Sequence, residues 1–153
     1  VDRVLRQRNT LLRQAGGRLT GPDTASTLDV WDTKLASAGT DLAEWLGQHG
    51  IDTLAVAGYM THNCVDSTVK QALHAGLAVE FLADAAGSLP YENRMGRASA
   101  EEIHRAFSVV MQSRFAAVAT ADEWIEALPT GKPLRRDNIY ASNQRARGLA
   151  NVA

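Results

Sequence analysis

The chain has 153 residues, of which 45% are hydrophobic and 22% are charged; this composition suits one folded domain and excludes wholesale disorder. Its 16 Lys and Arg against 17 Asp and Glu give a net charge of −1, so charge gives no reason to expect a nucleic-acid or membrane-surface protein. A single cysteine excludes an internal disulfide and a thiolate metal cluster, and no apolar run approaches the roughly 18 residues of a membrane helix, so we expect a cytoplasmic protein without a membrane partner.

The charge is unevenly distributed along the chain. The ends are basic, with +4 for Val1–Thr20 and +4 for Thr130–Ala153, whereas Gly21–Gly50 carries −4 and Ile51–Pro129 carries −5. Basic ends on an acidic middle raise the question whether all parts belong to one unit. The five arginines of the first segment are typical of a solvated helix face, and we expect no nucleic-acid partner.

The N-terminal part is predicted to be helical. A first helix covers Val1–Ala15, and after a loop rich in Gly and Pro the apolar residues of Leu28–Trp45 recur at intervals of three and four, which makes one continuous stripe. Gly39 interrupts this stripe at a cost of about 1 kcal/mol, and Thr40-Asp41 is equally suited to capping a second helix. One long helix and two shorter helices both fit the pattern.

From Ile51 the pattern changes to alternating strands and helices. The predicted strands are Thr53–Ala57, Leu77–Ala83 and Phe115–Ala119, and the predicted helices are Cys64–Ala75, Ser99–Ser113 and Thr120–Leu128. This order requires right-handed crossovers and gives an α/β fold with a parallel sheet of about three strands flanked by helices. Asp84–Gly96 is predicted to be a long loop, and the last 24 residues a basic surface tail.

The chemistry-bearing segment is Gly58-Tyr-Met-Thr-His-Asn-Cys64. It lies where the first predicted strand ends and a helix begins, and in open α/β sheets functional sites form at the carboxyl ends of the strands. A helix N-terminus favours a thiolate and offers N–H groups that can hold an oxyanion. A free cysteine is often an inert packing residue, so from position alone Cys64 is either a nucleophile or a core residue.

Three polar residues have both a structural and a functional interpretation. His62 can partner the thiol, but a loop histidine is more often solvated or hydrogen-bonded elsewhere. His104 lies within an amphipathic helix, which favours a structural role. Asp84, at the end of the second predicted strand, is a loop cap or a site carboxylate, with capping favoured.

Two long motifs resemble one family. Ile51-Asp-Thr-Leu-Ala-Val-Ala-Gly-Tyr-Met-Thr-His-Asn-Cys-Val65 and Ala75-Gly-Leu-Ala-Val-Glu-Phe-Leu-Ala-Asp-Ala85 are similar to isochorismatase-like cysteine hydrolases, a superfamily that includes nicotinamidases. The similarity covers about residues 39–147. The resemblance implies a Rossmann-like sheet, a small-molecule amide substrate, no cofactor or metal, a homo-oligomer, and Cys64 as the nucleophile that attacks an amide or imide carbonyl.

The same resemblance implies the surroundings of the nucleophile. It places a cis peptide bond between Met60 and Thr61, and it forms the oxyanion hole from the backbone N–H groups of Thr61 and Cys64. The other residues expected to line the site are Tyr59, His62, Asn63 and Asp84.

Two members of the family's catalytic triad have no counterpart in the sequence. The family carries a general-base Asp at the end of an N-terminal strand and a Lys. Here no apolar strand ending in Asp precedes Ile51, and an ungapped alignment places Trp31 at the Lys position, with Lys34 three residues away. General acid–base help is typically worth about 10²–10⁴-fold, so we expect weak activity at most unless His62, Asp84 or a partner chain supplies the base.

The N-terminal segment resembles a different family. Arg3-Val-Leu-Arg-Gln-Arg-Asn-Thr-Leu-Leu-Arg13 and Ser26-Thr-Leu-Asp-Val-Trp-Asp-Thr-Lys-Leu-Ala-Ser-Ala-Gly39 are similar to a helical stretch of the RecF-type DNA-repair ATPase. The phosphate loop and metal motifs of that family are absent from the sequence, so no ATPase role is implied. The two resemblances meet at Ala38–Ala43, which suggests a chimeric chain. We therefore expect a helical segment at 1–38, a truncated α/β domain at 39–129 and the tail at 130–153.

Two functions follow as hypotheses. The first is a cysteine hydrolase that cleaves a C–N bond of a small amide or imide through the Cys64 thiolate. The alternative is a non-catalytic α/β module that self-associates through its N-terminal helices or through an exposed strand edge at Thr53–Ala57, because an uncovered apolar edge invites pairing with another chain.

Overall fold

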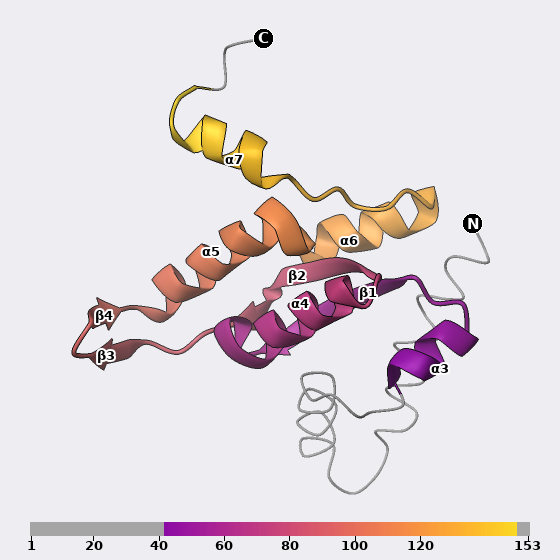
Figure 1. Cartoon of the computed structure of the whole chain (residues 1–153), viewed down its shortest axis with the longest axis horizontal. Helices are drawn as coiled ribbons and strands as arrows, with labels where there is room; N and C mark the ends of the chain where they lie inside the picture. Colours follow the sequence, from indigo (N-terminus) through magenta and orange to yellow (C-terminus); the bar gives the residue numbers. More distant parts are fainter. Residues whose placement is uncertain (1–41, 150–153) are drawn as a thin grey trace, which may run out of the picture.

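The structure is a computed structural model that describes residues 42–149 (Figure 1). Its first element is helix α3 (Leu42–Gln48), which contains the last turns of the predicted apolar stripe. The helix predicted at Val1–Ala15, the rest of the stripe, and the choice between one helix and two at Gly39 lie outside the described residues.

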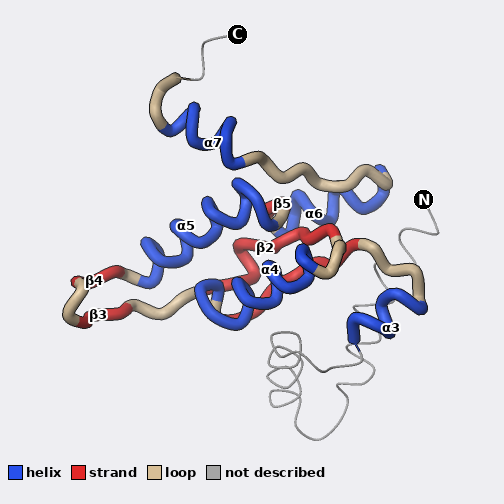
Figure 2. The backbone as a smooth tube through the Cα atoms, in the orientation of Figure 1, coloured by secondary structure: helices blue, strands red, loops and turns tan. Residues whose placement is uncertain are grey.

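A three-stranded parallel sheet forms the centre of the molecule. Its strands are β1 (Thr53–Tyr59), β2 (Ala78–Gly87) and β5 (Ala117–Ala119). They lie in the order β1-β2-β5, and both neighbouring pairs are parallel. The crossovers carry helices α4 (Asp66–His74) and α5 (Ala100–Val110), as the tube in Figure 2 shows. The predicted parallel α/β fold is confirmed.

The two faces of the sheet are covered by different helices. On one face, strand side chains pack with α3, α4 and the π-helical turn Met111–Phe115 into one core, in which Phe81 is fully buried. Because alternate residues of a strand point to opposite faces, Glu80 lies on the other face. There its Oε2 accepts a 2.8 Å hydrogen bond from Trp124 Nε1 of helix α6 (Ala121–Ala127).

The prediction of a long loop at Asp84–Gly96 is wrong. Strand β2 continues to Gly87 because its pairing with β1 shifts, so that Val56 pairs with Phe81 but Gly58 pairs with Ala86. An antiparallel hairpin follows, made of β3 (Tyr91–Asn93) and β4 (Gly96–Ala98). Its turn is closed by Met95 N, which donates to Asn93 Oδ1 at 2.9 Å, and by Gly96 at a φ of 128° that suits glycine.

Both helix starts predicted after the second strand are confirmed. Ser99 and Glu102 form a capping box at α5, and Thr120 forms another at α6. The hydrogen bond from the Ser99 backbone N–H lowers the pKa of the Glu102 carboxyl from its ordinary value of 4.5. Helix α6 passes into a short 3₁₀ turn, Leu128–Thr130, which contains the predicted stop at Pro129.

The predicted basic tail contains one more helix, α7 (Ile139–Ala146). Asn138 caps its start, since Asn138 Oδ1 accepts from Ala141 N at 2.8 Å. Arg145, in the last turn of the helix, forms an ion pair with Asp137, which precedes Asn138. The helix is short and its apolar periodicity is weak, so we attribute its formation to the Asn138 cap and the ion pair between Arg145 and Asp137. The division of the chain at residues 38 and 129 stays a prediction.

No helix within residues 42–149 combines the length and the apolar character needed to cross a membrane.

Candidate functional site

Cys64 lies in a helical turn at the carboxyl end of β1. The strand ends at Tyr59, and the π-helical turn Thr61–Val65 follows before α4 begins. The carbonyl oxygen of Met60 accepts from Asn63 N at 3.0 Å and from Val65 N at 3.3 Å, which fixes the turn on either side of the cysteine. Cys64 is a free cysteine and is half-buried as a residue.

The cis peptide bond lies between Tyr59 and Met60, so the predicted position between Met60 and Thr61 is wrong by one residue. The reason is where the chain leaves the strand. Met60 is extended, with φ −105° and ψ 142°, and Thr61 already belongs to the helical turn. The cis bond therefore joins the last residue of β1 to the one extended residue that precedes the helical turn.

The side chain of Thr61 is held between two distant elements. Thr61 is fully buried. Its Oγ1 donates to the carbonyl oxygen of Gly87, the last residue of β2, at 2.9 Å. The same oxygen lies 2.8 Å from Nδ1 of His104 in α5. The first residue of the cysteine turn is thus attached to both the strand and the helix that lie beside it.

His62 joins the same turn to the hairpin. Its Nδ1 is 3.0 Å from Ser88 Oγ, and its Nε2 is 2.8 Å from Tyr91 Oη. The Tyr91 ring meets the histidine edge-on at 5.1 Å between centroids, and Phe107 contacts it at 6.1 Å. Both ring nitrogens are therefore hydrogen-bonded to hydroxyls. This matches the interpretation of His62 as a satisfied loop residue and leaves it without a free lone pair for the Cys64 thiol in this arrangement.

The other residues expected to line the site lie in different surroundings. Tyr59 is 54% exposed, and its ring lies over Gly87, where an added Cβ would be 3.5 Å from it. Asn63 is exposed. Asp84 is also exposed, and its Oδ1 accepts from Ala121 N, the first N–H of α6, at 2.8 Å. Asp84 therefore bonds to the start of α6, whereas the sequence analysis favoured a loop cap.

Sequence reasoning missed the side chains that surround the turn. His104, interpreted as structural, bonds to Thr61 across 43 residues, and Ser88 and Tyr91 reach His62 across 26 and 29 residues. No spacing rule connects residues so far apart. Ser88 and Tyr91 were missed because they lie in the segment predicted to be a loop. A prediction of the hairpin would have placed both residues near the carboxyl ends of the strands.

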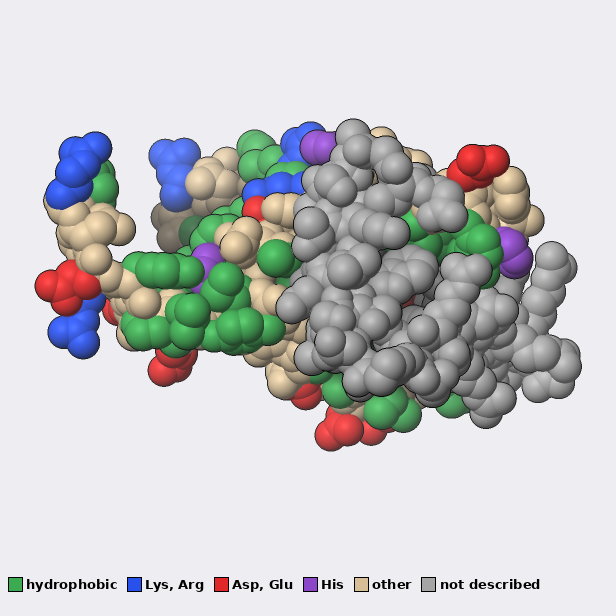
Figure 3. All heavy atoms as spheres, turned by 90° about the horizontal axis from the view of Figure 1, so that it is seen from below, with side chains coloured by type: hydrophobic (Ala, Val, Ile, Leu, Met, Phe, Trp, Pro, Cys, Tyr) green, Lys and Arg blue, Asp and Glu red, His purple; other side chains and the backbone are tan. Residues whose placement is uncertain are grey.

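Apolar side chains border the site on the hairpin side. The large exposed hydrophobic residues of this region are Tyr59, Leu89, Tyr91 and Met95. Figure 3 shows hydrophobic side chains gathered on part of the described surface. Within residues 42–149, no three His, Cys, Asp or Glu side chains are grouped to hold a metal ion.

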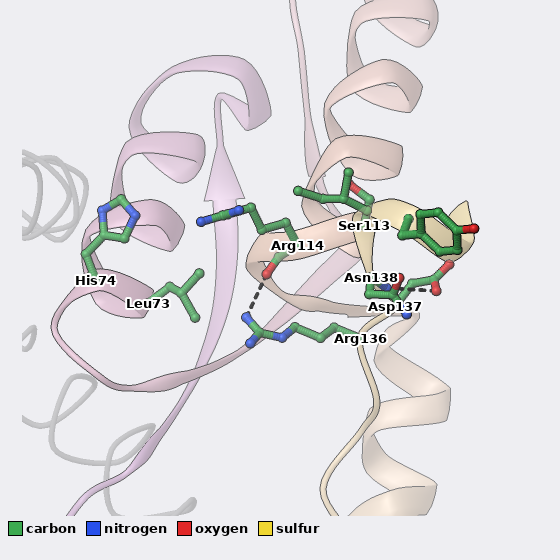
Figure 4. Close-up of a pocket in the computed structure, with 9 residues that line it drawn as sticks. Leu73, His74, Ser113, Arg114, Arg136, Asp137 and Asn138 are labelled. Atoms are coloured by element: carbon green, nitrogen blue, oxygen red, sulfur yellow. Dashed lines mark hydrogen bonds between the residues drawn. The ribbon is translucent and has the colours of Figure 1, made fainter. Parts of the chain in front are cut away.

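A groove of about 560 Å³ lies at the amino edge of the sheet, which is the side on which its strands begin. It is found between the end of α4 and residues 136–140 (Figure 4). It is lined by Leu73, His74, Ser113, Arg114, Arg136, Asp137, Asn138, Ile139 and Tyr140. These residues precede the amino ends of β2 and β5 or lie in the C-terminal segment. Arg136 donates from Nη1 to the Arg114 carbonyl oxygen at 2.6 Å. Because Cys64 follows the carboxyl end of a parallel strand, this groove is separate from the cysteine site.

A family model described as the Isochorismatase domain matches residues 17–123. Among solved structures, a candidate isochorismatase from Burkholderia xenovorans LB400 is 67% identical, with a TM-score of 0.70, over 75% of this chain and 55% of that chain. A cysteine hydrolase from Pseudomonas syringae pv. phaseolicola 1448A is 27% identical, with a TM-score of 0.59, over 62% of this chain and 45% of that one.

Curated relatives match over shorter stretches. The uncharacterized isochorismatase family protein YddQ of Bacillus subtilis is 30% identical over 87 residues, which are 57% of this chain and 48% of the relative. A nicotinamidase/pyrazinamidase of Mycobacterium tuberculosis is 44% identical over 46 residues, 30% of this chain and 25% of the relative. The chain thus spans about half the length of YddQ and of the Burkholderia protein.

A DNA replication and repair protein RecF from Frankia alni is 58% identical over 43 residues, 27% of this chain and 11% of the relative. The match is short and partial. The family model begins at residue 17, inside the segment predicted to have a different origin, so the chimera stays a prediction.

Proposed function

Because the chain belongs to the isochorismatase family, whose model matches residues 17–123, we propose that it is a cysteine hydrolase that cleaves the C–N bond of a small-molecule amide or imide. The observation that carries the proposal is the place of Cys64. It is a half-buried free cysteine in a hydrogen-bonded turn at the carboxyl end of β1, where open α/β sheets form their sites.

The proposed reaction has two stages. The Cys64 thiolate attacks the carbonyl carbon, and the carbonyl oxygen becomes an oxyanion that the backbone N–H groups of Thr61 and Cys64 stabilise. The C–N bond breaks as the nitrogen takes up a proton, which leaves a thioester on Cys64 and releases ammonia or an amine from an amide, or an amide from an imide. Water then attacks the thioester, so that the acid leaves and the thiol is restored.

Residues 42–149 supply no free general base for the Cys64 thiol among the two candidates, His62 and Asp84. The His62 ring nitrogens are both engaged, and Asp84 caps α6. A base that activates the thiol and later the water is typically worth about 10²–10⁴-fold. We therefore expect slow turnover by the chain alone and faster turnover if another part of the protein or a second copy supplies a carboxylate at Cys64.

The first test is amide turnover by the wild type and by Cys64→Ala, with ammonia release as the measurement. Nicotinamide and pyrazinamide are the first substrates to try, because a nicotinamidase/pyrazinamidase is among the partial relatives. We expect release by the wild type that exceeds the background and none by Cys64→Ala. Equal rates in the two proteins would exclude Cys64 as the nucleophile.

The second test measures the thiol without a substrate. An activated thiolate reacts faster with iodoacetamide at neutral pH than a free model thiol does. Mass spectrometry identifies the alkylated residue, and the chain offers a clean measurement because Cys64 is its one cysteine. A rate no faster than the model thiol would argue that Cys64 is not activated in this chain.

Self-association is a second candidate function, and it is favoured because β1 is an outer strand of the sheet. Within residues 42–149, β1 pairs with β2 alone, and Ala55 and Ala57 are exposed. Such an edge can pair with another chain. We expect the wild type to elute from size exclusion as a dimer or larger, and Ala55→Lys to elute as a monomer, with Ala106→Lys on an exposed position of α5 as control. A monomeric wild type would contradict this candidate.

A further inference from the structure

The hydrogen bonds of Thr61 determine where His104 carries its proton. A hydroxyl has one hydrogen to donate, and a carbonyl oxygen can only accept. The Thr61 hydrogen therefore points to the Gly87 carbonyl oxygen, 2.9 Å away. The contact of 2.8 Å with His104 Nδ1 must then have its hydrogen on the histidine. From this geometry we infer that His104 is protonated on Nδ1 and acts, through Thr61, as a positioning residue for the cysteine turn.

The chain of donors runs in one direction through three elements. His104 in α5 donates to Thr61 at the start of the turn, and Thr61 donates to Gly87 at the end of β2. Thr61 is fully buried, and β-branched side chains have few rotamers. Fixing its side chain between two rigid elements therefore also fixes the direction of its backbone N–H.

This inference rests on the proposed function for its catalytic consequence. The Thr61 N–H is one of the two proposed oxyanion donors, and such donors act only when they are aimed at the place where charge develops. His104 would set that aim without touching the substrate.

His104 is itself held in place. Ser108 Oγ donates to the His104 carbonyl oxygen at 2.8 Å, and the imidazole lies 6.4 Å from the ring of Phe81, which is fully buried. The helix that carries it begins at the capping box of Ser99 and Glu102. The Nδ1 donor therefore belongs to a side chain whose helix and ring both have defined contacts.

Burial alone does not produce such an arrangement in this protein. Thr68 is only 2% exposed, yet its hydroxyl has no hydrogen-bond partner in the part of the chain that the structure describes. Thr61, equally buried, has two partners on separate elements. Of these two buried threonines, the one with hydrogen-bonded partners is therefore the one in the turn that contains the cysteine.

The proton position can be tested with three variants. In His104→Asn the side-chain amide places an N–H close to the site of Nδ1, whereas in His104→Gln the N–H lies nearer the site of Nε2, and His104→Leu has no donor. We expect kcat for amide turnover to fall about 10–100-fold in the Gln and Leu variants. The Asn variant should stay within about threefold of the wild type, and KM should hardly change in any of the three. His74→Asn, an exposed histidine on α4, is the matched control.

Alkylation separates this role from general damage. Displacement of iodide by the thiolate develops no oxyanion, so iodoacetamide should modify Cys64 at equal rates in all four proteins and the wild type. A loss of alkylation parallel to the loss of kcat would mean that the variants disturb the thiol itself, and would overturn the positioning role.

The proton position is also measurable without any turnover. Long-range ¹H–¹⁵N NMR of the wild type distinguishes the two neutral tautomers of each histidine, and we expect the Nδ1–H form for His104. The backbone amide signals of Thr61 and Cys64 should keep their wild-type shifts in His104→Asn and move in His104→Gln. An Nε2–H tautomer, or equal behaviour of the two variants, would refute the inference. If the wild type hydrolyses no amide, the proposed function fails, and these NMR results still decide the role of His104.

Discussion

The two edges of the sheet use polar side chains in opposite ways. At the carboxyl edge, Thr61 is fully buried and His62 partly buried, and their hydrogen bonds span 26 to 43 residues. At the amino edge, the groove carries Arg114 and Arg136, which are exposed, and the one contact between them is to a backbone carbonyl. Side-chain hydrogen bonds to β2, α5 and the hairpin hold the cysteine turn, whereas the two arginines of the groove are exposed and joined through a backbone carbonyl.

The strongest test of this contrast compares the same substitution at two buried threonines. Thr61→Val removes the hydroxyl that bonds to the Gly87 carbonyl and to His104 Nδ1, and we expect it to lower the free energy of unfolding by about 1–3 kcal/mol. Thr68→Val removes a hydroxyl that has no partner within residues 42–149, so it should be neutral or slightly stabilising. Urea denaturation measures both.

The same pair of variants also checks the site. Amide turnover should fall in Thr61→Val and stay unchanged in Thr68→Val, because only the first residue lies in the cysteine turn. Equal losses of stability would show that the carboxyl-edge bonds contribute nothing beyond packing.

A smaller effect is expected from the link between the hairpin and the turn. Tyr91→Phe removes the hydroxyl that bonds to His62 Nε2 and should cost about 0.5–1 kcal/mol, since Tyr91 is 44% exposed. Arg136→Ala at the amino edge should change the free energy of unfolding by less than about 0.5 kcal/mol. Hydrogen exchange of the hairpin amides should rise in Tyr91→Phe alone, and an equal rise in both variants would contradict the contrast.

The smallest expected effect is a change in the free energy of unfolding at acidic pH. The hydrogen bond from Ser99 lowers the pKa of Glu102 in the folded protein, so the folded state binds fewer protons there than the unfolded state. This contribution to stability is present above a pH of about 4.5 and is lost as the pH falls through the lowered pKa. The difference in unfolding free energy between the wild type and Glu102→Gln should therefore shrink below that pH. A difference that is constant with pH would exclude the capping carboxylate as the cause.

Local patterns predicted much of the fold. The apolar run closed by Gly58 gave the first strand, and the Ser99 and Thr120 capping boxes gave two helix starts, because each depends on residues at most a few positions apart. The hairpin was missed because its strands have three residues each and alternate without a buried face. Strands that short carry too little periodicity to distinguish them from a loop.

The site was predictable only in its centre. Cys64 was found because its motif is local and lies at a strand end, and the capping role of Asp84 was favoured from its position. The partners of Thr61 and His62 depend on how far β2 continues and where the hairpin folds back, which is a tertiary property. The cis bond was misplaced by one residue because the resemblance placed it just before Thr61, whereas it lies between Tyr59 and Met60.

The long sequence separation of these hydrogen bonds also has a consequence during protein synthesis. The partners of the Thr61 hydroxyl, Gly87 and His104, follow it by 26 and 43 residues. While the polypeptide grows from its N-terminus, the cysteine is therefore made well before the groups that anchor its turn. A nascent chain that ends before α5 holds the thiol without His104, so the locked turn can arise only after that helix has emerged from the ribosome.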